Sequence, residues 1–446
     1  MVLPMRQLLD MVSSDTALPA AADVVVIGGG IAGVSAAYAL AKRGVSVVLV
    51  EKGQVGAEQS SRNWGWCRQQ GRDKGEIPLA RHAIGMWANM KSEIGVDVGW
   101  ENTGVLFVSN DLAQIASWQR WADYARGHQV HSRVLDTTGV AALMPGSTAK
   151  WTGGLHTPSD GKAEPSRAAP AIAAAARRLG AHVLQNCAAR GLDIQGGRVA
   201  GLVTEKGTIR TSSVLLAGGA WSTLFCRRHG IRLPQLSVRA SVLRTTPIPQ
   251  LAAANVATPG FCMRRTEDGG YVVAMSGTGT FPVTPDTLRY MFDFWATWKA
   301  RKAKLKLRPG LDFLAPFGGN ANWGMDAETP FERVRMLDPT PDDKLLTRGL
   351  VSFKETFPAA AGARIGRTWG GLIDATPDAV PVIDAVATLP GFFMATGFSG
   401  HGFGLGPAAG HLAADLVTGA TPIVDPTPFR YQRMIDGSRL APDSGL

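Results

Sequence analysis

The sequence predicts an α/β fold of two domains, the larger of which is built on a parallel, Rossmann-type sheet. Three observations predict it. A glycine-rich turn separates a β-branched strand from a helix at residues 24–42, as at the start of a βαβ unit. Two later apolar strands, at 213–216 and 391–396, also end in glycine-rich turns. The chain has 446 residues, and single cores tend to divide beyond roughly 250–300 residues, so a second domain is expected.

The composition is that of a globular protein. Apolar residues make up 45% and charged residues 18% of the chain, which excludes a disordered or fibrous protein. No stretch approaches the roughly 18 consecutive apolar residues of a membrane-spanning helix, and Asp10 interrupts the apolar start of the chain. We therefore expect a soluble, cytoplasmic protein. Its cysteines have no paired spacing, so we expect reduced, buried thiols at Cys67, Cys187, Cys226 and Cys262.

The βαβ unit near the start of the chain has the clearest sequence pattern. The pattern predicts a strand at Val24–Ile27, a helix from Ile31 to about Lys42 and a second strand at Ser46–Val50. Between the first strand and the helix, one glycine permits the tight turn, one lets a pyrophosphate approach the backbone and one lets helix and strand pack closely; these are Gly28, Gly30 and Gly33.

An acid follows at the end of the second strand. Glu51 stands 18 residues after Gly33, about where a carboxylate accepts hydrogen bonds from adenosine ribose hydroxyls. Strand, helix and acid in register predict dinucleotide binding. They do not distinguish a nicotinamide cofactor from a flavin.

The later elements favour the flavin. An alanine-rich helix at 167–179 leads to a strand at 181–186, a hairpin crossing Gly196 and Gly197, and the strand at 213–216. The strand at 391–396 is followed by a glycine-rich turn and a helix from about Gly406. FAD enzymes use such a last turn to bring a helix N-terminus against the pyrimidine end of the flavin, whereas a nicotinamide dehydrogenase rarely needs it.

Four motifs together carry a family resemblance. The glycine fingerprint, AGGAWS, WGGLIDATPDAVPVID and ATGFSGHGFGLGPAAG resemble the D-amino acid oxidase, glycine oxidase and sarcosine oxidase (DAO) family, in order from about residue 22 to 419. The resemblance implies non-covalent FAD in a glutathione reductase-like domain and a second α+β substrate domain on an antiparallel sheet. It implies an N-terminal extension at 1–20, FAD-domain segments at 21–104, 151–235 and 356–435, substrate-domain segments at 105–150 and 236–355, and a tail at 436–446.

The resemblance also implies a set of cofactor-binding residues. The loop after Glu51 is expected to run from the pyrophosphate to the flavin, although an ordinary Asx or Ser turn is the alternative there. The full expected set is Gly28, Gly30, Ile31, Ala32, Gly33, Glu51, Lys52, Ser60, Ser61, Arg62, Asn63, Ala189, Ala217, Gly218, Trp221, Gly371, Ile373, Phe398, Ser399, Gly400, His401 and Gly402.

Catalytic candidates stand in the same loop. Arg68 falls where sarcosine oxidases carry an arginine near the ring, and a cation there would stabilise the reduced flavin; a surface salt bridge is the alternative. Trp64 and Trp66 flank Gly65, and alternate residues of extended chain face opposite ways, so at most one is expected in the pocket. We expect Trp64 there, with core packing as an equal alternative for each.

Two more candidates lie elsewhere. His401, in SGHGFG, is expected near the flavin's pyrimidine carbonyl, or else acts as a capping residue turned away from the substrate. The hairpin FCMRRTEDGGYVVA carries Arg264 and Arg265, one of which would hold the substrate carboxylate as in glycine oxidase-like members. Solvated charges on an edge strand are the alternative.

Two departures from the family pattern stand out. Ile373 occupies the usual place of an arginine, and Asp374 puts an acid there, which could pair with an amine or cap the turn before Pro377. The lysine that sarcosine oxidases hold near the ring to help dioxygen accept electrons is absent between Tyr271 and Lys299.

The expected reaction is oxidation of a C–N bond of a D-amino acid or secondary amine by hydride transfer to the flavin, giving an imine that water hydrolyses. The missing lysine favours a dehydrogenase that passes electrons to a quinone or carrier protein. A peroxide-producing oxidase is the alternative, and a flavoprotein subunit or scaffold is the alternative outside catalysis. No metal is expected, because the histidines are scattered.

The net charge of +10 is concentrated in one place. Aromatic residues at 290–298 precede a run holding six basic residues at 299–308, which is typical of a segment resting on an anionic membrane surface. We expect a helix with a buried aromatic face and a solvated basic one, with peripheral contact at the inner face of a membrane as the alternative. No nucleic-acid motif is present.

Overall fold

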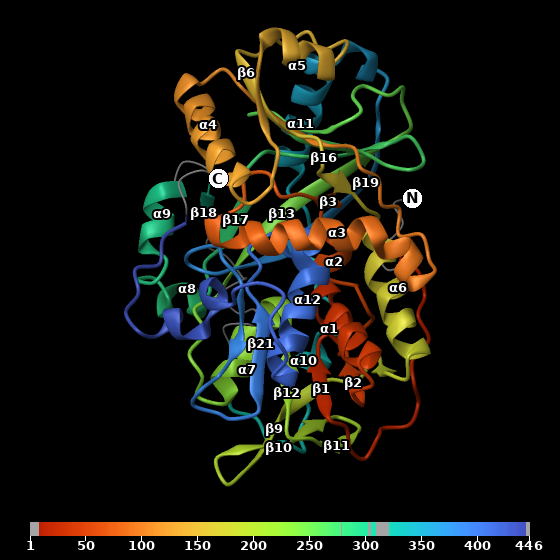
Figure 1. Cartoon of the computed structure of the whole chain (residues 1–446), viewed down its shortest axis with the longest axis vertical. Coiled ribbons are helices and arrows are strands. Elements are labelled where there is room, and N and C mark those ends of the chain that lie inside the picture. The colour runs from red at the N-terminus through yellow and green to blue at the C-terminus, as the bar shows by residue number, and fades with distance from the viewer. Residues whose placement is uncertain (1–8, 278, 302–304, 309–320, 443–446) are drawn as a thin grey trace.

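The computed structural model describes residues 9–277, 279–301, 305–308 and 321–442. Two large sheets lie one above the other along the long axis of the molecule (Figure 1). The lower, six-stranded sheet has the order β20-β21-β12-β1-β2-β8. Its strands are β1 (Val24–Ile27), β2 (Val47–Val50), β8 (His182–Leu184), β12 (Val214–Leu216), β20 (Val382–Ala385) and β21 (Phe392–Thr396).

The six-stranded sheet is parallel except for its edge strand β20. Every residue of β1 and β2 is buried, which explains why these strands are uninterrupted runs of valine, isoleucine and leucine rather than alternating ones. Val24 and Val26 pack into the core beneath the helices. Val25 and Ile27 pack into a second core on the opposite face.

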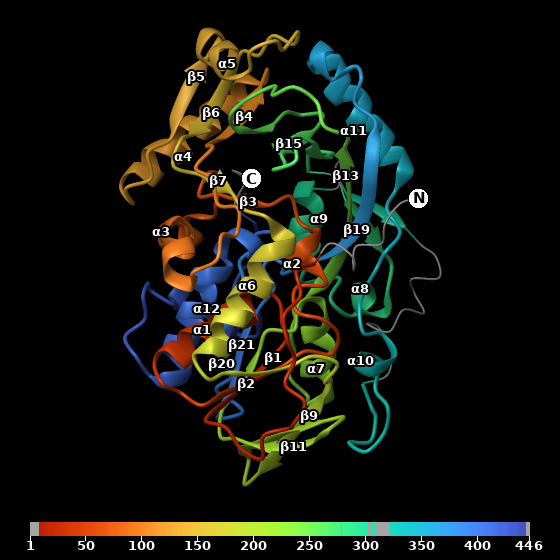
Figure 2. The same ribbon diagram turned by 90° about the vertical axis from the view of Figure 1, so that its right-hand side faces the viewer.

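Helices cover the first face and a small sheet covers the second. α1 (Ile31–Lys42) packs on α12 (Gly402–Thr418) and on α6 (Pro165–Arg178), and α3 (Ile77–Ile94) crosses α12 (Figures 1 and 2). On the other face lie α7 and a three-stranded sheet whose residues share the second core. These elements are α7 (Ser222–Arg228), β9 (Ala189–Gln195), β10 (Arg198–Thr204) and β11 (Gly207–Arg210).

The upper sheet has ten strands, mostly antiparallel, in the order β18-β17-β13-β16-β15-β14-β4-β6-β5, with β19 on β13. The long strands β13 (Leu236–Thr245) and β19 (Ile365–Ala375) run side by side over their whole length (Figure 2). The others are β4 (Val105–Ser109), β5 (Arg133–Asp136), β6 (Gly153–Thr157), β14 (Asn255–Ala257), β15 (Cys262–Arg265), β16 (Tyr271–Ala274), β17 (Gly279–Pro282) and β18 (Leu305–Arg308).

Short elements complete the chain. β3 (Trp66–Cys67) pairs with β7 (Gly161–Lys162), and helices α4 (Leu112–Arg126), α5 (Thr137–Leu143) and α11 (Asp343–Thr356) flank the upper sheet. The remaining helices are α2 (Gln59–Arg62), α8 (Pro285–Arg289), α9 (Trp295–Arg301) and α10 (Pro330–Arg333). None of the described helices is both long enough and apolar enough to cross a membrane. All four cysteines are free and buried, as expected.

The predicted βαβ unit and the hairpin at 261–275 are confirmed, with strand ends shifted by a residue. Other expectations need correction. α12 begins at Gly402, four residues before the expected Gly406, because its first turn is built from glycines that propensity alone scores as a loop. β6 and β19 belong to the upper sheet and lie in segments expected for the FAD domain, whose boundaries stay a prediction. The basic run is not one helix: α9 ends at Arg301, β18 pairs with β17, and Lys302 and Lys304 lie outside the described residues.

Candidate cofactor and substrate site

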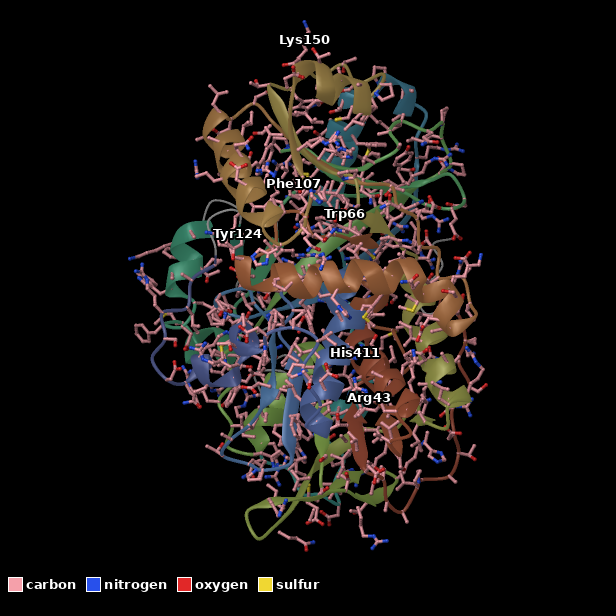
Figure 3. The ribbon with its side chains drawn as sticks, in the orientation of Figure 1. Arg43, Trp66, Phe107, Tyr124, Lys150 and His411 are labelled. Carbon is pink, nitrogen blue, oxygen red and sulfur yellow. The ribbon has the colours of Figure 1, made fainter. Side chains whose placement is uncertain are left out.

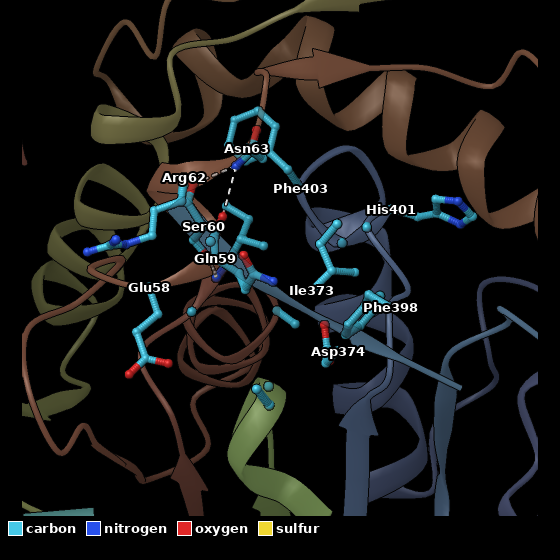
Figure 4. Close-up of a pocket in the computed structure, with 18 of the residues that line it drawn as sticks. Glu58, Gln59, Ser60, Arg62, Asn63, Ile373, Asp374, Phe398, His401 and Phe403 are labelled. Atoms are coloured by element: carbon cyan, nitrogen blue, oxygen red, sulfur yellow. Dashed lines mark hydrogen bonds between the residues drawn. The ribbon is translucent and has the colours of Figure 1, made fainter. Parts of the chain in front are cut away.

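One cavity of about 510 Å³ lies between the two sheets. Its walls come from the turn before α1, the loop at 51–72, the ends of β12 and β21, strands β13 and β19, and helix α4 (Figure 4). Twenty of the twenty-two expected cofactor-binding residues line it; Gly33 and Ser61 do not. The carboxyl ends of parallel strands therefore open into this cavity, which is where open α/β sheets bind ligands.

The three fingerprint glycines have different structural roles. Gly28 has φ +107°, and a Cβ there would lie 2.4 Å from the carbonyl oxygen of Ala217. A Cβ on Gly33 would lie 2.0 Å from the carbonyl oxygen of Gly28. A Cβ on Gly30 would meet only the Ser60 hydroxyl, at 3.3 Å, so this backbone faces open space at the N-terminus of α1. That space fits the pyrophosphate of a dinucleotide.

Glu51 is fixed at the end of β2. Its carboxylate accepts hydrogen bonds from the backbone amides of Gly29 and Gly53, each at 2.7 Å, and burial raises its pKa. The residue still lines the cavity. It is therefore held in place by the fingerprint turn itself, where a ribose hydroxyl could donate to it.

The loop residues expected on the cofactor also shape the loop. The Ser60 hydroxyl accepts the amide of Ile31 at 2.8 Å, which satisfies one free donor of α1. Asn63 accepts the Gly65 amide at 2.7 Å and donates to two carbonyls within the loop. Arg62 donates to the carbonyl of Gly370 at 3.0 Å and pairs with Asp338 at 2.6 Å. The Asx turn that was the alternative interpretation is thus present in a loop that also lines the cavity.

Glu58 was not foreseen from the sequence. Its carboxylate accepts from Lys52 Nζ at 2.6 Å, from Trp221 Nε1 at 3.2 Å and from the Leu337 amide at 3.1 Å. Lys52 also stands 4.5 Å from the centre of the Trp221 ring. These groups close the cavity at the end near β2 and β12. Trp221 and Leu337 come from distant segments, so the sequence around Glu58 does not mark these contacts.

At the turn before α12, Asp374 has a structural role. Its carboxylate accepts the Gly397 amide at 2.9 Å and Gln235 Nε2 at 3.3 Å, and its carbonyl accepts the Ser399 amide. Burial raises its pKa to about 6. Asp374 lines the cavity, but it caps the turn after β21 rather than the turn before Pro377. Ile373, from the same strand, faces the turn (Figure 4).

Both tryptophans of the loop line the cavity, so the expectation that only one would do so is wrong. Gly65 between them has φ +78°, which breaks the alternation of an extended chain. The rings of Trp64 and Trp66 meet edge to face at 5.5 Å, and Phe107 and Trp118 continue the aromatic wall. The part of the cavity under the upper sheet is therefore largely aromatic.

Two arginines stand against this wall. Arg68 lies 5.5 Å from the centre of the Phe107 ring and donates to the Gln70 carbonyl. Arg72 donates to the Arg68 carbonyl at 3.2 Å, and its Nη1 is buried without a hydrogen-bond partner. Burial lowers the pKa of Arg68, and that of Arg72 to about 9. Within the described residues neither makes an ion pair, so both hold positive charge available to an anion.

The two hairpin arginines are not among the residues that line the cavity. Arg264 pairs with Glu164 at 2.7 and 3.3 Å, and its side chain is 3% exposed. Arg265, its neighbour on β15, points to the other face, beside Tyr271. Cys262 of the same strand lines the cavity instead. The sequence did not show that Arg264 pairs with Glu164, 100 residues away, and this ion pair keeps Arg264 out of the cavity.

His401 precedes α12 and lines the cavity, yet its ring points away from Arg62 and Asn63 (Figure 4). Its Nδ1 lies 3.4 Å from Oε2 of Glu76, a fully buried carboxylate at the start of α3. Among the described residues no group of three or more histidine, cysteine or acidic side chains could hold a metal ion.

Comparison with known proteins agrees with this geometry. The chain is similar over 424 residues to human mitochondrial sarcosine dehydrogenase, with 26% identity over 92% of the chain, but it spans only 41% of that enzyme's length. It is 24% identical to sarcosine oxidase subunit beta of an Arthrobacter species, covering 93% of the chain and 91% of the subunit. The solved structure of L-amino acid deaminase from Proteus myxofaciens in complex with anthranilate superposes with a TM-score of 0.92 and 32% identity, over 95% of this chain and 96% of that one.

The model of one protein family, described as FAD-dependent oxidoreductase (DAO), matches residues 23–416. That range includes the fingerprint, the loop at 51–72, both long strands of the upper sheet and nearly all of α12. The chain belongs to the DAO family of FAD-dependent oxidoreductases.

Proposed function

We propose that this protein oxidises the C–N bond of an amino acid or an N-substituted amino acid, with FAD as the acceptor of hydride. The observation that carries the proposal is the continuity of one cavity from the fingerprint glycines to an aromatic chamber holding Arg68 and Arg72. A cofactor site and a pocket suited to a small carboxylate thus share one space. The names of the relatives, which act on amino acids or sarcosine, support the same reaction class.

Arg68 is the residue best suited to bind the substrate carboxylate. It lines the cavity, carries no competing ion pair within the described residues, and lies beside the ring of Phe107. A planar guanidinium can grip a carboxylate with two parallel hydrogen bonds. We assign the carboxylate to Arg68, with Arg72 behind it, in preference to the expected Arg264 and Arg265.

The remaining residues position the substrate and exclude water. Hydride transfer from an amine needs a neutral amine and a reacting carbon about 3–3.5 Å from its acceptor, and positioning supplies much of the rate. Trp64, Trp66 and Phe107 supply a low-polarity wall for this. FAD supplies the hydride acceptor when bound. Gly400, His401 and Gly402, at the start of α12, line the end of the cavity where negative charge is expected to develop.

We propose further that the enzyme is a dehydrogenase. Within the described residues Lys52 is the only lysine lining the cavity, and its ammonium is bound to Glu58 and two carbonyls. Among the described residues that line the cavity, no lysine is therefore available to assist dioxygen. The alternatives are a peroxide-producing oxidase and, because one relative is named a subunit, a flavoprotein that turns over only within a complex.

A dehydrogenase needs an electron acceptor, and the surface around α8 and α9 suits a membrane-bound one. Phe292 is 83% exposed and Trp295 48% exposed, beside the partly exposed Trp298. Lys299 lies 5.2 Å from the centre of the Trp295 ring, at the start of the basic run. Exposed aromatic rings with lysine beside them match the interface of an anionic bilayer.

The test is an anaerobic screen followed by reoxidation. Purified yellow protein is mixed without air with D- and L-amino acids, N-methyl amino acids, cyclic imino acids and opines, and the loss of flavin colour is recorded. The proposal expects at least one class to bleach the flavin rapidly. Reoxidation should then be slow with air and fast with a soluble quinone. Rapid reoxidation by air with peroxide release would replace the dehydrogenase by the oxidase, and bleaching only after a partner protein is added would favour the subunit.

A further inference from the structure

A buried carboxylate and an imidazole meet behind the cavity. Glu76 stands at the N-terminus of α3 with its side chain fully buried, and His401 stands at the N-terminus of α12 with its side chain 12% exposed. Oε2 of Glu76 lies 3.4 Å from Nδ1 of His401. Glu76 does not line the cavity, whereas His401 does. The imidazole therefore connects a buried acid to the space where the flavin is expected.

The charged groups around Glu76 act on the pKa of its carboxyl in opposite directions. Burial raises the pKa of Glu76 to about 7, against the lowering effect of Arg72 and Arg68 from the preceding loop. The backbone amide of Asp73 also lowers this pKa, whereas the carboxylate of Asp378, itself paired with Arg433 at 2.8 Å, raises it. Two titratable groups in contact share their protons as a unit. The expected amine oxidation makes no use of such a pair, because hydride transfer needs no acid at this place.

We propose that Glu76 and His401 form a proton store that takes up one proton from solvent when the bound FAD is reduced. A hydride brings two electrons and one proton to the cofactor and so adds one negative charge beside His401. Uptake of a second proton by the pair restores the net charge of the site. Without it, the carboxylate of Glu76 would stand close to a like charge in a medium of low polarity, which is unfavourable.

The inference rests on the proposed function only for the position of FAD, and its test needs no amine substrate. The midpoint potential of protein-bound FAD is measured from pH 5.5 to 8.5 by equilibration with a reference dye under chemical reduction. For a two-electron couple, each proton taken up changes the potential by about 30 mV per tenfold change in proton concentration. The wild type should therefore show a slope of about 60 mV per pH unit around neutrality, for two protons.

Glu76→Gln and His401→Asn should each reduce the slope to about 30 mV per pH unit over the same range, for one proton. Either variant suffices if the other fails to retain FAD, and FAD content and melting temperature are measured for both. A purely structural role of Glu76 would lower the melting temperature but leave the slope unchanged. That result, or a one-proton slope in the wild type throughout, would overturn the proposal.

Helix α12 offers a matched control at its opposite end. His411 Nε2 lies 3.6 Å from Oδ1 of Asp415, which also pairs with Arg43, the residue that follows α1 (Figure 3). This pair has the same chemistry but does not line the cavity. His411→Asn and Asp415→Asn should keep the two-proton slope of the wild type. A loss of slope in these variants would show that the effect comes from the general charge of α12, and would contradict a store located at Glu76 and His401.

Discussion

Arg68 is the side chain on which substrate affinity should depend. Arg68→Ala removes the cation that faces the aromatic wall. It should lower kcat/KM by the equivalent of about 2–5 kcal/mol, the loss typical of a buried charge left without its partner. The change should appear mainly in KM, and FAD content should stay at the wild-type level. Steady-state kinetics with the substrate found in the screen, together with the flavin-to-protein absorbance ratio, measure both.

Arg264→Ala is the matched control for Arg68. It breaks a buried pair with Glu164 and should lower the melting temperature while changing KM little. If Arg264→Ala raised KM strongly and Arg68→Ala did not, the carboxylate would bind at the hairpin, as the sequence alone suggested.

Two glycines of the fingerprint should separate cofactor binding from folding. Gly30→Ala adds a methyl group that meets only the Ser60 hydroxyl, so the apoprotein should fold, but the methyl group enters the space expected for the pyrophosphate and FAD retention should fall. Gly33→Ala drives a methyl group into the Gly28 carbonyl and should reduce soluble yield itself. Circular dichroism and FAD titration of the apoproteins distinguish the two. Normal FAD affinity in Gly30→Ala would refute the assigned pyrophosphate position.

The position of a single residue could be predicted from the sequence when its contacts are with residues nearby in the chain. Gly28, Gly30 and the turn at 398–402 belong to continuous motifs, so their placement on the cavity was predictable. Glu58 and Glu76 acquire their partners from segments far along the chain, and nothing nearby in the sequence marks them. The prediction that only one of Trp64 and Trp66 lines the cavity was wrong because the positive φ of Gly65 breaks the alternation of side chains along an extended strand.

Helix α12 holds the floor of the cavity through close contact with α1. A Cβ on Gly410 would lie 2.5 Å from the Ala36 amide nitrogen, and one on Gly406 would lie 2.6 Å from Cγ1 of Ile31. Gly410→Val should therefore push the helices apart, lower the melting temperature and release FAD. In α3, Gly85 has nothing within 4 Å of its would-be Cβ. Gly85→Ala should instead stabilise the protein by about 0.5–1 kcal/mol through helix propensity.

Both predictions are checked by measuring the free energy of unfolding in denaturant and the release of FAD for Gly410→Val and Gly85→Ala. Equal behaviour of Gly410→Val and the wild type would mean that the contact between α1 and α12 does not support the site. The glycine content that makes this contact possible also hid the start of α12 from propensity, which is why the helix was expected four residues late.

The strands of the βαβ unit were predictable because buried parallel strands are continuous apolar runs. The strand pairing of the upper sheet was harder to predict from the sequence. β13 pairs with β19 through contacts such as that of Leu236 with Ala375, and pairing over so large a separation leaves no local signal. For the same reason β6 and β19 could not be assigned to the upper sheet from sequence.

At the scale of the whole molecule, we expect the protein to bind anionic vesicles through the surface around α8 and α9. The holoprotein should sediment with vesicles containing phosphatidylglycerol and stay in solution with phosphatidylcholine alone, and added salt should weaken the binding. Phe292→Ser should reduce binding because it removes the most exposed aromatic ring of the α8–α9 surface. Val351→Ser, which changes an exposed residue of α11, is the control and should bind as the wild type. Binding that ignores lipid charge, or that survives Phe292→Ser unchanged, would refute this surface as the contact.

In the proposed reaction, the cavity holds the C–H bond next to the amine against the flavin. Anaerobic stopped-flow mixing of the holoprotein with a bleaching amino acid measures this step, using matched substrate with hydrogen or deuterium at the carbon bearing the amine. The flavin absorbance should fall in a single turnover, and deuterium should slow this step several-fold, because the C–H bond breaks as the flavin is reduced. Flavin that no amino acid or amine reduces, under these conditions and with FAD fully bound, would contradict it.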